Sequence, residues 1–341
     1  MLIVVPFVCV MLASTGTAGA SLTTGWSQTT SLPATDWNMG TAVSGGEIYV
    51  AGGGGTNGVN PVKTVEVFNP TTKVWTAKAT LPTARGGLVL VPGTGGLLFA
   101  IGGHTATDSA TSLNTAYNPA TNTWTAKAPL PQDRTDMGAT TGGPYHRIFT
   151  VGGYNPFTGQ ADAAMFRYSQ STNTWTDMKS LPAARSYPAV ASSGGNVYVF
   201  GGGVNASPFI TNFVGTKSAF EYDVSTNSWK TLAPMPVAEL GAAAVTGADG
   251  LIYVIGGTQQ SVIGWCNQTI QIYNPKTNTW SQSALPNTDP QGGLGATGVF
   301  EEGAVAIGTQ LYFVGGQWLE PDGSGGLAEG FLNTVFTATT S

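Results

Sequence analysis

Short apolar runs recur along this chain, and each of them ends in a double glycine. The pairs stand at Gly52/Gly53, Gly102/Gly103, Gly152/Gly153, Gly201/Gly202, Gly256/Gly257 and Gly315/Gly316. An aromatic residue lies three positions before each pair, at Tyr49, Phe99, Phe149, Tyr198, Tyr253 and Tyr312. Apolar runs of this length predict strands that are buried on both faces, and glycine lets the backbone leave sharply where chains crowd together.

A second pattern follows each of the first five double glycines. An aromatic residue precedes a tryptophan by seven positions, in the pairs Phe68/Trp75, Tyr117/Trp124, Tyr168/Trp175, Tyr222/Trp229 and Tyr273/Trp280. A proline step then closes each unit, at Leu81-Pro82, Leu130-Pro131, Leu181-Pro182, Met235-Pro236 and Leu285-Pro286. Asn-Pro steps such as Asn69-Pro70 predict the turn between two strands, and the large flat rings predict the packing between neighbouring units.

The two patterns together repeat about every fifty residues, which is typical of a propeller blade. A single four-stranded unit cannot bury both of its faces, so successive units must stack around a ring. Counting the double glycines predicts an all-β propeller of six blades that spans residues 21–341.

The ends of the repeat predict how the ring closes. Trp26 and the step Leu32-Pro33 repeat the tryptophan strand without any earlier strands of a blade, whereas residues 332–340 supply a third strand, with Phe336 in the aromatic place, but no tryptophan strand after it. We therefore expect the N-terminal strand to complete the last blade, which removes exposed sheet edges.

This order of features resembles the kelch repeat, most closely in GLIYVIGG at residues 250–257 and YNPKTNTW at residues 273–280. The resemblance covers residues 21–341 and implies a kelch-type β-propeller. Because kelch propellers serve as adaptors, carbohydrate-active enzymes and structural proteins alike, the resemblance leaves the activity open.

The composition restricts the cellular compartments and the classes of partner that are expected for this chain. The chain has 341 residues, 48 glycines and only 9% charged side chains, as a sheet-rich single domain requires. Its net charge of −5 argues against nucleic acid as a partner. Residues 2–12 form an apolar run too short to span a bilayer, and Ala18-Gly19-Ala20 follow it, so residues 1–20 are predicted to be a signal peptide. We expect a monomer that is secreted, or periplasmic if the source is Gram-negative, without a membrane partner.

Few residues suggest metal or thiol chemistry. Cys266 is the only cysteine after the predicted signal peptide, so no intramolecular disulfide is expected. Asn205 and Asn267 match the glycosylation pattern, which matters only in a eukaryotic source. His104 and His146 are predicted to be solvent-facing loop residues on opposite faces, so neither a metal site nor a cofactor is expected.

One repeat position is charged throughout a chain that has few charges. Four residues after the leucine or methionine of each proline step stand Asp36, Arg85, Arg134, Arg185, Glu239 and Asp289, and Glu301 competes with Asp289 for the sixth place. We call these positions the charged ring. They are expected to encircle the mouth of the central channel, with Arg85 opposite Glu239. The ring either neutralises itself as a structural device, or its arginines bind an acidic sugar.

Enlarged loops give a second candidate surface. The loop at residues 203–217, the loops that carry Trp265 and Trp318, and an insertion at residues 290–300 lie on adjacent blades. All belong to the face formed by the connections between second and third strands and between successive blades, which we call the loop face. Exposed aromatic residues there would anchor a ligand.

The predicted function is therefore a secreted module that binds a glycan or a protein, without catalytic residues. The alternative is an enzyme resembling the kelch epimerase, or mutarotase, of sialic acid; that family uses a neighbouring glutamate and arginine, which residues 203–217 lack, so the charged ring would have to replace them. A third candidate, resemblance to the kelch copper radical oxidases, implies a copper site that needs two histidines. His104 and His146 are expected on different faces, so they are not expected to share a metal.

Overall fold

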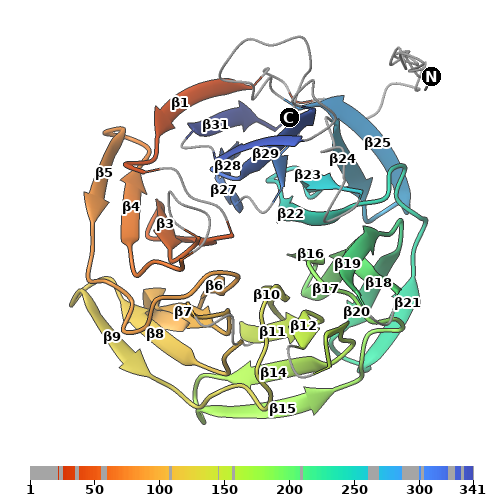
Figure 1. Ribbon diagram of the computed structural model, residues 1–341, viewed down its shortest axis with the longest axis horizontal. Coiled ribbons are helices and arrows are strands. Elements are labelled where there is room, and N and C mark those ends of the chain that lie inside the picture. Colours follow the sequence, from red (N-terminus) through yellow and green to blue (C-terminus); the bar gives the residue numbers. More distant parts are fainter. Residues whose placement is uncertain are drawn as a thin grey trace, which may run out of the picture.

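A computed structural model shows the chain as a six-bladed β-propeller, with the blades following one another around a ring (Figure 1). It describes residues 22, 26–34, 38–54, 60–106, 110–144, 146–155, 158–207, 210–259, 269–285, 299–300, 303–321, 327–331 and 334–340. No helix among them has the length and apolar character needed to cross a membrane. The predicted signal peptide, residues 1–20, lies outside the described residues.

Each blade is a four-stranded antiparallel sheet that runs from the ring centre outwards. Blade one is β2 (Gly40–Ser44), β3 (Glu47–Ala51), β4 (Val65–Asn69) and β5 (Val74–Ala77). Blade two is β6 (Val89–Pro92), β7 (Leu98–Ile101), β8 (Asn114–Asn118) and β9 (Thr123–Ala126), with the 3₁₀ turn η1 (Thr94–Gly96) between β6 and β7. Blade three is β10 (Gly138–Gly142), β11 (Arg147–Val151), β14 (Met165–Ser169) and β15 (Thr174–Met178).

The remaining blades follow the same order. Blade four is β16 (Ala189–Ser193), β17 (Asn196–Phe200), β20 (Ala219–Asp223) and β21 (Ser228–Thr231). Blade five is β22 (Leu240–Thr246), β23 (Ile252–Thr258), β24 (Thr269–Asn274) and β25 (Thr279–Ala284). Blade six is β27 (Gly303–Ile307), β28 (Gln310–Val314), β31 (Thr334–Thr339) and β1 (Ser27–Ser31).

The predicted closure of the ring is confirmed. Strand β1, from the start of the chain, pairs antiparallel with β31, from its end, and the two lie side by side in Figure 1. The ring of Trp26 meets Phe313 of β28 edge-on, with 6.5 Å between their centroids. Leu32 is buried where the strand leaves the blade. The N-terminal strand therefore supplies both hydrogen bonds and core packing to blade six.

The repeated aromatic, asparagine and tryptophan residues form a clamp between neighbouring blades. In blade two, the indole N–H of Trp124 donates to the carbonyl of Ala79 in blade one at 2.7 Å. The amide oxygen of Asn122 accepts from the backbone N–H of Ala79 and from the hydroxyl of Tyr117, both at 2.8 Å. The same clamp recurs in the next three blades, with Tyr168/Asn173/Trp175 on Ala128, Tyr222/Asn227/Trp229 on Lys179 and Tyr273/Asn278/Trp280 on Ala233. The aromatic repeat is thus structural core, as predicted.

Among the residues that the structure describes, this clamp is found on neither side of blade six. In blade one, which follows it around the ring, Phe68 and Lys73 replace the tyrosine and the asparagine. Lys73 keeps the left-handed backbone of the asparagines, with φ of 58°. Among the described residues, the indole nitrogens of Trp75 and Trp26 are buried and find no hydrogen-bond partner. In the described part of the chain, the contacts of blade six with blades five and one therefore lack the indole hydrogen bonds that join the other blades.

Replacing Lys73 with asparagine should stabilise the protein. Asparagine tolerates the left-handed region better than lysine does, so we expect Lys73→Asn to raise the free energy of unfolding by about 1 kcal/mol. Urea denaturation measures the change. Lys230→Asn is the matched control, because Lys230 is also exposed but lies in β21 outside the left-handed region. An equal gain in both variants would contradict the explanation.

The loop face carries extra sheets. Two-stranded hairpins rise from blade three, as β12 (Tyr154–Asn155) and β13 (Gln160–Ala161), and from blade four, as β18 (Gly203–Ser207) and β19 (Ile210–Gly215). On blade six, β26 (Val299–Phe300), β29 (Gln317–Pro321) and β30 (Leu327–Phe331) form a three-stranded sheet. The loops predicted on blades four and six are thus ordered strands, and the hairpin on blade three was not predicted.

Candidate functional site

The described members of the charged ring are buried. Arg85, Arg134, Arg185 and Glu239 stand just before the first strand of their blades and expose 0%, 1%, 7% and 1% of their surface. Asp36, Asp289 and Glu301 lie outside the described residues.

The backbone of the charged ring explains the double glycines. The carbonyl oxygen of Arg85 accepts a hydrogen bond from the N–H of Gly53 in the preceding blade at 2.9 Å. A Cβ on Gly52 would stand 2.3 Å from the same oxygen, so only glycine allows this approach. The next three blades repeat the contact, through Gly103 to Arg134, Gly153 to Arg185 and Gly202 to Glu239. The double glycines therefore supply the donor, and the charged ring supplies the acceptor, of one contact that is repeated between blades.

The side chain of Arg85 turns back into its own blade. Its Nη1 donates to the carbonyls of Ala100, Gly102 and Leu113 at 2.9–3.3 Å, and its Nη2 donates to the hydroxyl of Thr115 at 2.9 Å. Burial lowers the pKa of the Arg85 guanidinium to about 10, so the group remains charged at neutral pH. The guanidinium therefore joins the ends of β7 and β8, where the carbonyl of Leu113 also accepts from the N–H of Gly102 at 2.8 Å.

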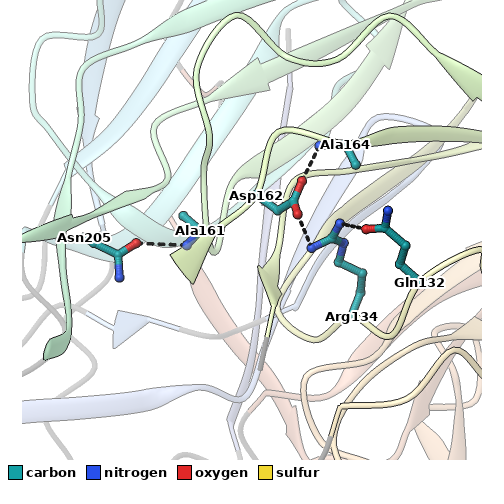
Figure 2. A network of polar contacts seen from close by, with 6 residues as sticks. All are labelled: Gln132, Arg134, Ala161, Asp162, Ala164 and Asn205. Atoms are coloured by element: carbon teal, nitrogen blue, oxygen red, sulfur yellow. Dashed lines mark hydrogen bonds and ion pairs between the residues drawn. The ribbon is translucent and has the colours of Figure 1, made fainter. Parts of the chain in front are cut away.

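Arg134 links the charged ring to the loop face, as Figure 2 shows. Its guanidinium forms an ion pair of 2.6 Å with Asp162 and also donates to Gln132. The other carboxylate oxygen of Asp162 accepts from the backbone N–H of Ala164 at 2.7 Å. Asp162 follows β13 directly, so this ion pair positions the base of the blade-three hairpin.

The remaining two members are also paired within their blades. The Nε of Arg185 donates to Ser218 at 3.0 Å, its guanidinium lies 6.0 Å from the centre of the Phe220 ring, and burial lowers its pKa. Glu239 accepts from the amide of Gln271. The expected pairing across the channel is therefore wrong for Arg85 and Glu239, because each finds nearer partners in its own blade. Binding of an acidic ligand by the charged ring remains a prediction, with no exposed guanidinium to support it.

The channel mouth is formed two residues further along each repeat. A central cavity of about 200 Å³ is lined there by Asn38, Gly87, Asp136, Tyr187 and Gly241, which we call the mouth residues. The N–H of each mouth residue from Gly87 onwards donates to the carbonyl of the mouth residue in the preceding blade, at 2.9–3.1 Å. All five have left-handed backbones, with φ between 51° and 68°. An arc of four backbone hydrogen bonds therefore fixes the rim of the cavity from blade one to blade five.

Asp136 is the centre of a polar cluster at this rim. The carboxyl of Asp136 is 8% exposed and accepts hydrogen bonds from the side chains of Asn38, Thr135 and Tyr187, with 3.2 Å from Asn38 Nδ2 to Oδ1. The Nδ1 of His104 lies 3.1 Å from the Thr135 hydroxyl. Burial raises the pKa of Asp136, and nearby His104 and the hydrogen bonds partly oppose that shift.

The structure separates the two histidines. His104 is half-buried against the polar cluster, so the prediction of a solvent-facing loop residue is wrong for it, because the bridge to Gly86 draws it over the channel rim. His146 is exposed, as predicted. Within the described part of the chain, no three His, Cys, Asp or Glu side chains gather as a metal site would require.

The hairpins of blades three and four are fastened together. The amide oxygen of Asn205 accepts from the N–H of Ala161 at 2.9 Å (Figure 2), and its Nδ2 donates to the carbonyl of Gly159 at 3.0 Å. Phe213 of β19 is buried, with its ring centre 5.8 Å from that of Tyr154 and 6.1 Å from that of Tyr187. The two hairpins and the channel rim therefore form one continuous surface.

The side chains of the two tryptophans that are predicted to anchor a ligand on the enlarged loops lie outside the described part of the structure. Trp265 lies outside the described residues. Trp318 lies on β29, where it pairs with Gly330, but its side chain is outside the described part of the structure.

We expect Asn205 to be unmodified in folded protein secreted from eukaryotic cells. Both polar atoms of its amide are in hydrogen bonds within the hairpin pair, and a glycan on Nδ2 would break them. Peptide mass spectrometry of an Asn267→Gln variant tests this, because Asn205 is then the only remaining acceptor site. A glycan on most copies of the Asn205 peptide would contradict the hairpin geometry.

Comparison with known proteins agrees with this architecture. The family model described as the KLHDC2/KLHL20/DRC7 Kelch-repeats domain matches residues 94–316, and the Kelch motif matches residues 38–82. Kelch-like protein terF of Aspergillus terreus is 30% identical over 178 residues, which cover 50% of this chain and 36% of terF. Beta-scruin of Limulus polyphemus is 28% identical over 143 residues, which cover 39% of this chain and 15% of beta-scruin. The chain thus spans well under half of these relatives.

A solved structure titled "Structure of YjhT" has the same fold. It superposes with a TM-score of 0.68 at 15% identity, over 88% of this chain and 98% of that one. The repeat, the closed ring and the family match over more than half of the sequence agree, and the chain belongs to the kelch-repeat family.

Proposed function

We propose that this kelch propeller is a secreted binding module that takes a glycan or a protein on its loop face. Kelch propellers are typically interaction modules, and the relatives include kelch-like proteins such as Kelch-like protein 23 of Homo sapiens. The observation that carries the proposal is the difference between the two faces of the ring.

The face opposite the loop face is built from tight turns. The first and second strands of blade one turn at Gly45 and Gly46, and those of blade four turn at Gly194 and Gly195. The additional sheets on blades three, four and six are all on the loop face. Added structure on one face of a rigid scaffold is typical of a binding surface.

The surface is also held in place before any ligand arrives. Asn205 joins the two hairpins, Phe213 packs between Tyr154 and Tyr187, and Arg134 supports the base of the first hairpin through Asp162. A surface that is already ordered loses less conformational entropy on binding, so more of the contact energy appears as affinity. The half-buried rings of Tyr154 and Tyr187 provide aromatic contact area.

Catalysis by the charged ring, in the manner of the sialic acid epimerase, has less support. The guanidinium groups of Arg85 and Arg134 are buried and already bound to groups of their own blade. A substrate would have to displace these contacts within blades two and three.

Trimming one hairpin tests the proposal. Gly203 and Gly215 are cross-strand partners, so Asn-Gly in place of residues 204–214 leaves a two-residue turn in register. The control replaces residues 93–97 on the opposite face with Asn-Gly, between the partners Pro92 and Leu98. Each protein is applied to a glycan array and used for affinity capture of proteins from the medium of its source.

We expect the parent and the control to bind alike, and the hairpin-trimmed protein to lose its binding while remaining folded by circular dichroism. Full binding by the trimmed protein, or an absence of specific glycan and protein ligands for the parent, would contradict the proposal. The intact mass of exported protein tests secretion separately, since we expect a chain that begins near Ser21.

A further inference from the structure

We infer that the channel mouth is a binding site for a small protonated amine, with the carboxylate of Asp136 as its counter-ion. This inference goes beyond the proposed function, because the site lies at the rim of the central cavity and not on the hairpins.

Several blades contribute polar groups to this one place. Asn38 of blade one reaches across Gly87 of blade two to the Asp136 carboxyl of blade three, and Tyr187 of blade four reaches the same carboxyl from the other side. The absence of a side chain on Gly87 is required, since a Cβ there would stand 2.3 Å from the Thr135 hydroxyl and 2.4 Å from Asp136 Oδ1. The adjoining cavity of about 200 Å³ has room for a ligand of few heavy atoms.

Asp136 lacks a permanent positive partner. The chain has 13 lysines and arginines, and all of them are among the described residues. The one ion pair found among those residues joins Arg134 to Asp162, so no lysine or arginine pairs with Asp136. Burying a carboxylate without a counter-ion is unfavourable, and neutral donors such as Asn38 and Tyr187 offset that cost only in part. An ammonium group in the cavity would supply the missing charge.

The backbone conformation of the mouth residues also supports a binding site at Asp136. Gly87 and Gly241 show that glycine satisfies the left-handed conformation of a mouth residue. Asn38, Asp136 and Tyr187 nevertheless hold side chains in that conformation, which is least favourable for the bulky tyrosine. Strain of this kind gathers where a side chain has a functional contact, and the side chains of Asn38 and Tyr187, together with that of Thr135, donate to the Asp136 carboxyl.

The protonation of Asp136 gives the site a characteristic pH dependence. The titratable side chains that face Asp136 from the described elements are His104, which follows β7, and Tyr187, which precedes β16. Because burial raises the pKa of Asp136, its carboxyl loses its charge at a higher pH than the carboxyl of an exposed aspartate does. The amine binds the carboxylate form, so its affinity should increase as the pH rises through the pKa of Asp136 and the amine remains protonated.

Calorimetric titration with matched pairs of small molecules tests the site. Ethanolamine and glucosamine are the amine probes, and ethylene glycol and glucose are their neutral counterparts. The variant Asp136→Asn keeps hydrogen-bonding capacity and shape but removes the charge. We expect both amines to bind the parent at about pH 7, where both are largely protonated, and Asp136→Asn to bind them at least about tenfold more weakly, as loss of a charge-assisted contact predicts.

Binding of glucose as tight as that of glucosamine, or unchanged amine affinity in Asp136→Asn, would overturn the proposal. If that variant fails to fold, the parent alone decides, through the rise in its melting temperature with ethanolamine between about pH 5 and pH 8, a range in which this amine stays protonated. A rise that grows with pH and is absent with ethylene glycol supports the site, and a rise independent of pH overturns it. The hairpin-trimming experiment tests the proposed function independently, so a negative result at the amine site does not contradict that function.

Discussion

Deleting residues 21–33 should destabilise the mature protein by several kcal/mol and promote its aggregation. The deletion removes β1, its antiparallel pairing with β31, the contact of Trp26 with Phe313 and the buried side chain of Leu32. Loss of large buried side chains costs about 2–5 kcal/mol each, and the freed edge of β31 becomes able to pair with other molecules. Thermal denaturation and light scattering measure the two effects.

Addition of a synthetic peptide with the sequence of residues 21–33 is the control. The peptide should restore the melting temperature in part, because β1 is joined to the rest of blade six by noncovalent contacts along β31. A peptide with the same composition in scrambled order should not. A deletion variant as stable as the parent would show that β1 does not close the ring.

Replacing Arg85 with alanine should lower the free energy of unfolding by about 3–5 kcal/mol, because it removes the buried hydrogen bonds of the guanidinium and leaves a cavity in place of a large side chain. The guanidinium is fully buried and donates to Ala100, Gly102, Leu113 and Thr115. Arg85→Lys should be nearly as damaging, since an ammonium group cannot reproduce the planar fork of donors. Urea denaturation measures both variants.

Arg167→Ala is the control for charge alone, because Arg167 lies half-buried on β14 and is not a member of the charged ring. We expect its effect to be within about 1 kcal/mol. An Arg85→Ala protein as stable as the control, with altered binding of acidic glycans, would favour a ligand-binding charged ring over a structural one.

The sequence was sufficient to predict the ring of blades because each repeated residue has one structural role. The double glycines admit the carbonyl of the next blade, the aromatic residues fill the core and the tryptophans clamp neighbours. The charged ring was expected to encircle the channel mouth, but the mouth is formed two residues further along each repeat, and the described members turn into their own blades. Arg85 turns inward because its acceptors are mostly backbone carbonyls, which leave no trace in residue identity.

The channel mouth could not have been predicted from residue types. The mouth residues share a backbone conformation and an arc of hydrogen bonds, but no chemical property. His104 likewise joins the polar cluster through its bridge to Gly86, a contact between neighbouring blades. A left-handed position that tolerates several residue types carries no periodic signal in the sequence.

Hydrogen–deuterium exchange, with and without a ligand identified on the glycan array or by capture, tests the binding face most directly. If the loop face binds, the ligand should slow exchange in residues 154–161 and 203–215, which form the two fastened hairpins. The turns at residues 44–47, 93–97 and 193–196 on the opposite face should exchange at unchanged rates. Protection confined to those turns, with the hairpins unaffected, would contradict the account.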